Sequence, residues 1–96
     1  MKATLLAATK EVRNDNTIVE IMVWSLPEPL PPCTHRYKYR LFYGQPGERQ
    51  IGYDNERGKG DHRHWLGKQT NYQFTTPEKL LADFEADIAA IEGRSK

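Results

Sequence analysis

Polar and apolar residues alternate along residues 36–41 within the segment HRYKYRLFY at 35–43, where tyrosine and leucine take one set of positions and arginine and lysine the other. A period of two residues predicts a strand with one packed face and one cationic face. Residues 49–54 follow a turn that contains glycine and proline, and they are predicted to form a second strand that pairs with residues 35–43. The two segments therefore form a predicted antiparallel hairpin.

Two further strands are predicted before this hairpin. Residues 17–24, TIVEIMVW, are mostly apolar at both sets of alternate positions, which is typical of a central strand. Residues 3–8 have the length of a strand, and RNDN at 13–16 is typical of a turn between the two. The prolines of LPEPLPP at 26–32 predict an extended connection inside one domain.

The period changes to that of a helix near the end of the chain. Thr76 is suited to cap this helix, Pro77 to its first position and Gly93 to its end. The apolar stripe consists of Leu80, Leu81, Phe84, Ile88 and Ile91. The sequence thus predicts an α+β fold, an antiparallel sheet of about four strands with one C-terminal amphipathic helix packed on one face.

Length and composition define the class of protein. The 96 residues fit a single domain over 1–96, with an ordered core expected at about residues 2–92. A single cysteine cannot form an internal disulfide, which favours a cytoplasmic location, and no apolar run is long enough for a membrane span. The net charge of +1 is unevenly distributed, because cations outnumber carboxylates between residues 34 and 70 and carboxylates outnumber cations between 72 and 93.

Residues 55–71 are rich in glycine and polar side chains and lack a sustained apolar period, so they are predicted to form a long exposed loop. Its centre reads GKGDHRHWLG. We expect Trp65 to anchor this loop on the sheet. A solvated loop without further function is the plain alternative to each chemical role considered below.

General acid and base catalysis is the first such role. The candidate catalytic residues are His62, His64, Asp61 and Asp54. The two imidazoles would transfer protons, a carboxylate would orient them, and Lys59 or Arg63 would stabilise charge on a phosphorane. This set suits metal-independent RNA cleavage, in which the nucleophile is the 2′-hydroxyl of the substrate itself.

Anion binding is the second role and is compatible with the first. The backbone N–H groups of the GKG run can bind a phosphate, and cationic side chains would extend the surface along a nucleic acid. The candidate phosphate- or RNA-binding residues are Lys59, Arg63, Arg57, Arg36, Lys38 and Arg40. The alternative for the strand cations is an ordinary solvated sheet face.

Metal binding is the third role. Asp61, His62 and His64 are competent zinc ligands, but in an extended segment the two histidines point to one side and the aspartate to the other. The remaining imidazole, His35, is distant in sequence. We therefore expect neither a metal nor a cofactor.

Four segments together resemble a known family: WSLPEPLPP, HRYKYRLFYG, YDNERGKGDHRH and LLADFEADI. In this order they resemble the TumE-like toxin components of bacterial and archaeal toxin–antitoxin modules, over nearly the whole chain. The run from YDNE to GKGDHRH is the specific part. The residues in this motif are Tyr53, Asp54, Asn55, Gly58, Lys59, Gly60, Asp61, His62 and His64.

The resemblance implies a small cytosolic protein that inhibits growth and is neutralised by a cognate antitoxin. We expect a toxin that acts on RNA, and an antitoxin that covers the basic loop instead of the acidic helix. Two alternatives remain: a non-catalytic module that binds nucleic acid or a nucleotide, and a component that binds only protein.

Overall fold

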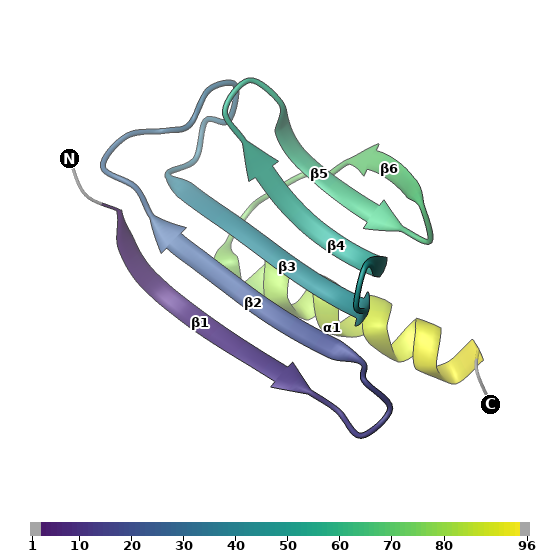
Figure 1. Cartoon of the computed structure of the whole chain (residues 1–96). Helices are drawn as coiled ribbons and strands as arrows, with labels where there is room; N and C mark the ends of the chain where they lie inside the picture. Colours follow the sequence, from purple (N-terminus) through teal and green to yellow (C-terminus); the bar gives the residue numbers. More distant parts are fainter. Residues whose placement is uncertain (1–2, 95–96) are drawn as a thin grey trace.

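The protein is an α+β layer structure in which one helix covers one face of a single antiparallel sheet (Figure 1). The structure is a computed structural model that describes residues 3–94. Six strands follow one another in chain order across the sheet. The elements are β1 (Thr4–Val12), β2 (Ile18–Ser25), β3 (Tyr37–Gln45), β4 (Glu48–Glu56), β5 (Gly60–Trp65), β6 (Lys68–Asn71) and α1 (Pro77–Arg94).

The predicted architecture is confirmed, but the predicted number of strands is wrong. Residues 55–71 are not a long loop, because they contain the whole hairpin of β5 and β6. Gly58 in the turn before β5 and Gly60 at the start of β5 adopt φ values of 85° and 79°. Leu66 and Gly67, with φ of 48° and 87°, form the two-residue turn between β5 and β6. Both central residues of such a turn need positive φ, which a leucine rarely adopts, so this hairpin carries little signal in the sequence.

The core lies between α1 and the covered face of the sheet. Tyr39, Leu41 and Tyr43 of β3 are buried, so the alternating stripe of this strand is core as predicted. Leu80 and Phe84 of α1 are also almost wholly buried. The remaining buried members of the cluster are Val23, Ile51, Tyr53, Ile88 and Ile91.

The ends of α1 follow from local sequence. The side chain of Thr76 accepts a hydrogen bond from the N–H of Lys79 at 3.1 Å, which confirms the predicted cap. Pro77 is the first helical residue. Gly93 lies inside the last turn and does not end the helix.

Carboxylates of α1 point toward the sheet as well as toward solvent. Three tyrosine hydroxyls donate to them: Tyr53 to Asp87 at 2.5 Å, Tyr72 to Asp83 at 2.6 Å and Tyr43 to Glu92 at 3.3 Å. Burial, followed by the bond to Asp87, raises the pKa of Tyr53 above its ordinary value. These bonds supply the partners that buried hydroxyls need under the helix.

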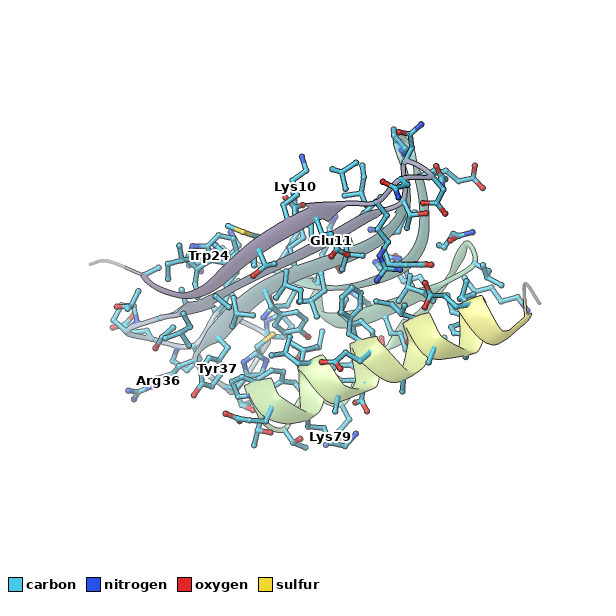
Figure 2. The ribbon with its side chains drawn as sticks, turned by 90° about the horizontal axis from the view of Figure 1, so that it is seen from below. Lys10, Glu11, Trp24, Arg36, Tyr37 and Lys79 are labelled. Carbon is cyan, nitrogen blue, oxygen red and sulfur yellow. The ribbon has the colours of Figure 1, made fainter. Side chains whose placement is uncertain are left out.

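The opposite face of the sheet is left uncovered. Figure 2 shows Lys10 and Trp24 on the side away from the helix and Tyr37 on the helix side. The connection between β2 and β3 runs in turns and bends instead of the extended path predicted for it, and the N–H of Gly58 donates to the carbonyl of Pro31 at 2.8 Å. No helix within the described part of the chain combines the length and the apolar character of a membrane span.

We predict that Asp87→Ala destabilises the protein by about 2 kcal/mol, because the guanidinium of Arg63 and the hydroxyl of Tyr53 lose their shared partner. Urea unfolding monitored by circular dichroism would measure this loss. The matched control is Glu85→Ala on the exposed side of α1, which should change the free energy of unfolding by less than about 0.5 kcal/mol. Equal effects of the two substitutions would contradict the proposed role of this carboxylate.

Candidate active site

The two histidines of the motif project from β5 onto the uncovered face of the sheet. In the antiparallel pairing of β4 and β5, His62 lies opposite Asp54 and His64 lies opposite Gly52. Residues two apart on a strand share a face and lie about 7 Å apart along it. The pairing therefore places both imidazoles and the Asp54 carboxylate side by side on one rigid surface.

The imidazole of His64 lies between the carboxylate of Asp54 and the guanidinium of Arg49. Its Nε2 lies 3.2 Å from Asp54 Oδ1, and its Nδ1 lies 3.0 Å from the Arg49 guanidinium. Because arginine can only donate, Nδ1 is the acceptor and the ring proton is on Nε2, directed at Asp54. This is a neutral imidazole with a fixed tautomer and orientation.

Arg49 reaches His64 by lying over Gly52. The pairing between β3 and β4 shifts by one residue near the turn, so that Gly44 faces Arg49 while Tyr43 faces Ile51. A Cβ atom at Gly52 would lie 2.6 Å from Cδ of Arg49. The glycine thus leaves the space through which the arginine crosses the sheet.

His62 is the free imidazole of the pair. Across residues 3–94 its ring takes part in no hydrogen bond or ion pair. It lines a hollow of about 490 Å³ together with Arg49, Asp54, Glu56, Lys59, His64 and Gln69. A partly exposed and unengaged histidine beside an oriented one is suited to proton transfer.

A second hollow adjoins the first on the same face. It measures about 740 Å³ and shares Asp54 and Glu56 with the histidine hollow. Its other lining residues include Trp24, Met22, Lys38, Arg40 and Arg57. The Lys38 ammonium lies 5.7 Å from the centre of the Trp24 ring, and the Arg40 guanidinium lies 2.6 Å from Glu20. Arg36 precedes β3 in an exposed position of the connecting segment.

The structure does not bring Asp61 and Arg63 to the histidines. The expectation of one loop is wrong, because alternate residues of a strand point to opposite faces. Arg63 makes a two-pronged ion pair with Asp87 of α1 at 2.8 and 2.9 Å and contacts the Tyr53 hydroxyl. The bond to Asp87 raises the pKa of Arg63 further above its ordinary value. Trp65 packs partly buried against the core, as predicted for an anchor.

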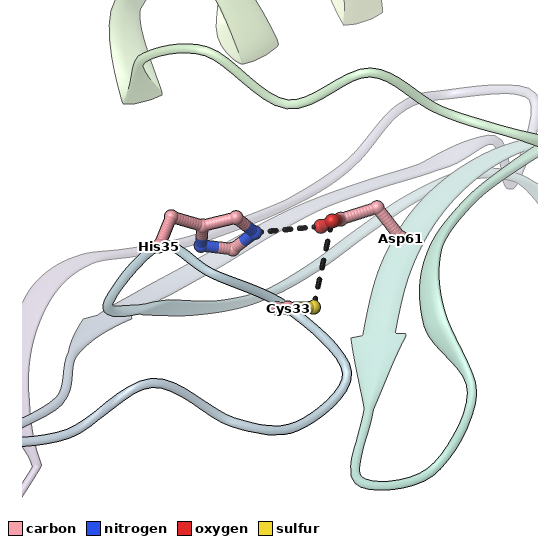
Figure 3. Close-up of side chains that lie close together, drawn as sticks. All are labelled: Cys33, His35 and Asp61. Atoms are coloured by element: carbon pink, nitrogen blue, oxygen red, sulfur yellow. Dashed lines mark hydrogen bonds and ion pairs between the residues drawn. The ribbon is translucent and has the colours of Figure 1, made fainter.

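Asp61 instead belongs to a polar cluster on the helix side of the sheet. Its carboxylate lies 2.8 Å from His35 Nε2, 3.4 Å from Cys33 Sγ and 2.5 Å from the Tyr39 hydroxyl. Figure 3 shows Cys33 and His35 on the segment before β3 and Asp61 at the start of β5, all directed at one another. Burial raises the pKa of the Cys33 thiol, which makes it the donor to Asp61. His35, distant in sequence, is thus adjacent to Asp61 in space.

The remaining motif residues shape the hairpin. Asn55 is buried and accepts a hydrogen bond from the Tyr39 N–H at 2.9 Å while donating to the Tyr37 carbonyl at 2.8 Å. Tyr53 lies under the helix. Gly58 and Gly60 supply the positive φ values of the turn. These four positions support the surface that carries His62 and His64.

Sequence reasoning missed Arg49 and Gly52 at the histidines and Cys33 and His35 at Asp61. A glycine in the middle of a predicted strand is a signal of close approach by another group, so Gly52 was a usable clue. Arg49 could not be placed, because the register shift next to it reverses the face that alternation assigns.

Comparison with known proteins gives one positive finding. A family model described as Toxin TumE matches residues 2–92. The resemblance seen in the sequence is therefore confirmed at the level of the family. No curated protein and no solved structure matches the chain.

We predict that Gly52→Ala displaces Arg49 from His64 without unfolding the sheet, because the new methyl group meets a flexible side chain. Ring-nitrogen NMR shifts of His64 should then show the loss of the hydrogen bond at Nδ1. The control is Gly93→Ala, whose Cβ would meet nothing within 4 Å. An unchanged Nδ1 signal in Gly52→Ala would show that Arg49 does not need this path.

Proposed function

Because the chain belongs to the TumE toxin family, we propose that it is the toxin component of a toxin–antitoxin module and that it cleaves RNA without a metal ion. The observation that carries the proposal is the pairing of a free His62 with a His64 oriented by Asp54 on an uncovered sheet face. Membership of the family supports the role as a toxin, and the geometry of the histidines on β5 supports the proposed cleavage chemistry. We expect it to act in the cytoplasm.

The two histidines divide the proton transfers. Asp54 holds the Nε2 proton of His64, so Nδ1 is the nitrogen that can act as a base once Arg49 leaves it. A phosphate that draws the guanidinium of Arg49 to itself would uncover this nitrogen. His64 then takes the proton of the 2′-hydroxyl, the 2′-oxygen attacks the phosphorus, and protonated His62 delivers a proton to the departing 5′-oxygen.

Cations near the histidines stabilise the reaction. Arg49 and Lys59 line the hollow that holds both imidazoles, so either can face the charge that develops on the phosphorane. The ammonium of Lys59 is exposed and lies 3.5 Å from Glu56. Such a solvated pair is weak and can be exchanged for a phosphate contact.

The adjoining hollow is the proposed path for the rest of the substrate. Trp24 offers a ring on which a base can stack, and Lys38, Arg40 and Arg57 offer contacts for the phosphates. Stacking on an aromatic side chain requires an unpaired base. The arrangement therefore favours single-stranded RNA that crosses the face from β2 toward β5.

A non-catalytic role is the second candidate, and one observation favours it. Both ring nitrogens of His64 are engaged, so the histidine proposed as the base is blocked in the resting surface. If Arg49 stays on His64 when RNA is bound, the same face would hold the strand without cutting it. Binding without cleavage products is the result that distinguishes this candidate.

We predict that His62→Ala combined with His64→Ala lowers RNA cleavage by at least about a hundredfold, since each proton transfer contributes that much or more. Growth inhibition on expression should disappear with it. The assay uses purified protein with single-stranded RNA, alongside circular dichroism to confirm the fold.

Glu78→Ala combined with Glu85→Ala serves as the control for this double variant, because both side chains are exposed on α1. Growth inhibition by the histidine variant equal to that of the wild type would refute the catalytic assignment. Loss of cleavage in a chelator while circular dichroism shows an intact fold, restored by one divalent ion, would refute metal independence.

We further predict that the cognate antitoxin binds the basic rim of this face. Reversal of Arg57 and Lys59 to glutamate should slow association at low salt at least tenfold, because opposite charges steer the encounter. Arg63 is left intact because Asp87 already binds it.

Stopped-flow mixing at two salt concentrations measures the rate. Reversal of Glu78 and Glu85 to lysine is the matched comparison on the exposed side of α1. A larger loss in the helix variant, with both folds intact, would place the antitoxin elsewhere.

A further inference from the structure

The polar cluster on the helix side of the sheet brings three metal-ligating side chains together. The thiol of Cys33, the imidazole of His35 and the carboxylate of Asp61 each offer a ligand atom, and all of these atoms lie within 4.8 Å of one another (Figure 3). Cys33 is 8% exposed, and the side chains of His35 and Asp61 are 15% and 16% exposed. Among the described residues, no lysine or arginine forms an ion pair with Asp61.

We infer that Cys33, His35 and Asp61 bind a divalent cation of the zinc class. Thiolate, imidazole and carboxylate are the donors that zinc takes in proteins, at about 2.0–2.3 Å, which places neighbouring donors between about 3 and 4 Å apart. His35 Nε2 lies 2.8 Å from one carboxylate oxygen of Asp61 and Cys33 Sγ lies 3.4 Å from the other. With one ligand atom from each residue, all three lie within 4.8 Å of one another, so side-chain shifts of about 1 Å would reach that spacing. One thiolate and one carboxylate would balance the charge of the ion, and the fourth position is open to water.

The surroundings already orient two of the three ligands. The side-chain amide of Asn55 lies 3.7 Å from Cys33 Sγ as a donor, and the Tyr39 hydroxyl donates to Asp61. Asn55 is itself fixed by two bonds to the backbone of β3. Outer partners of this kind hold a thiolate and a carboxylate in place for an ion.

His35 must change its tautomer when the ion binds. Its Nδ1 accepts the N–H of Tyr37 at 3.2 Å, which leaves the ring proton on Nε2, toward Asp61. An ion at Nε2 replaces that proton, so the ring must carry its proton on Nδ1 and the bond from Tyr37 must open. The Tyr37 amide therefore reports directly on occupation of the site.

The role of the ion is structural. Cys33 and His35 belong to the segment between β2 and β3, and Asp61 belongs to β5. An ion would join that segment to the hairpin whose opposite face carries His62 and His64. This inference does not rest on RNA cleavage, because the ligands lie on the other side of the sheet from the histidine pair.

The test is titration of the metal-free full chain with Zn²⁺ and Co²⁺. We expect one ion per chain in native mass spectrometry, a thiolate-to-cobalt charge-transfer band, a shifted Tyr37 amide signal and a higher unfolding temperature. Cys33→Ser should abolish the band and weaken binding at least a hundredfold, and Asn55→Ala should weaken it about tenfold. His62→Ala combined with His64→Ala is the matched control and should bind as the wild type does.

Two results would overturn the inference. One is stoichiometric binding that survives in Cys33→Ser and disappears in the histidine-pair variant, which would place the ion on the uncovered face. The other is the absence of binding at micromolar Zn²⁺ in wild type that is folded by circular dichroism. Either result leaves the cleavage experiment unaffected, since that assay reads the opposite face.

Discussion

The bonds between buried tyrosine hydroxyls and the carboxylates of α1 fix where the helix lies on the face of the sheet that it covers. Tyr53 and Arg63 both bind Asp87, and Tyr72 binds Asp83 four residues earlier on the helix. Apolar burial supplies most of the stability of this interface, but it does not choose the position of the helix along the sheet. The hydroxyls do, because a buried O–H without an acceptor costs more than a shifted apolar contact. Some of the carboxylates of this acidic helix therefore serve as internal hydrogen-bond acceptors and are not free to bind a partner.

Covering one face divides the motif between two environments. Asp61, Arg63 and Trp65 point toward the helix side, while His62 and His64 point to the uncovered side. A stretch that is continuous in sequence therefore contributes to two separate sites, back to back on β5. Strand pairing holds both sites at a fixed distance. This rigidity orients His64 against Asp54 before any substrate is present.

The sequence was sufficient to predict those parts of the fold in which the periodic apolar positions are also the positions buried in the core. The stripe of α1, the cap at Thr76 and the buried face of β3 were all predicted. Strand β5 was missed because its helix-side residues are an aspartate, an arginine and a tryptophan, whose partners lie on distant elements. A strand whose buried positions are polar carries no hydrophobic signal. The cluster of Cys33, His35 and Asp61 could not be predicted either, since only the folded chain brings these segments together.

Three cations on the uncovered face are paired with carboxylates, and this pairing bears on how the surface would select RNA. Arg40 lies 2.6 Å from Glu20, Arg49 lies 3.9 Å from Asp54, and Lys59 lies 3.5 Å from Glu56. A single phosphate would gain little by displacing one carboxylate, because an exposed pair already satisfies the cation. A strand with several phosphates and a base stacked on Trp24 can displace several carboxylates at once. The net charge of +1 is therefore compatible with RNA binding. The pairing of these cations disfavours retention of isolated phosphates or short anions.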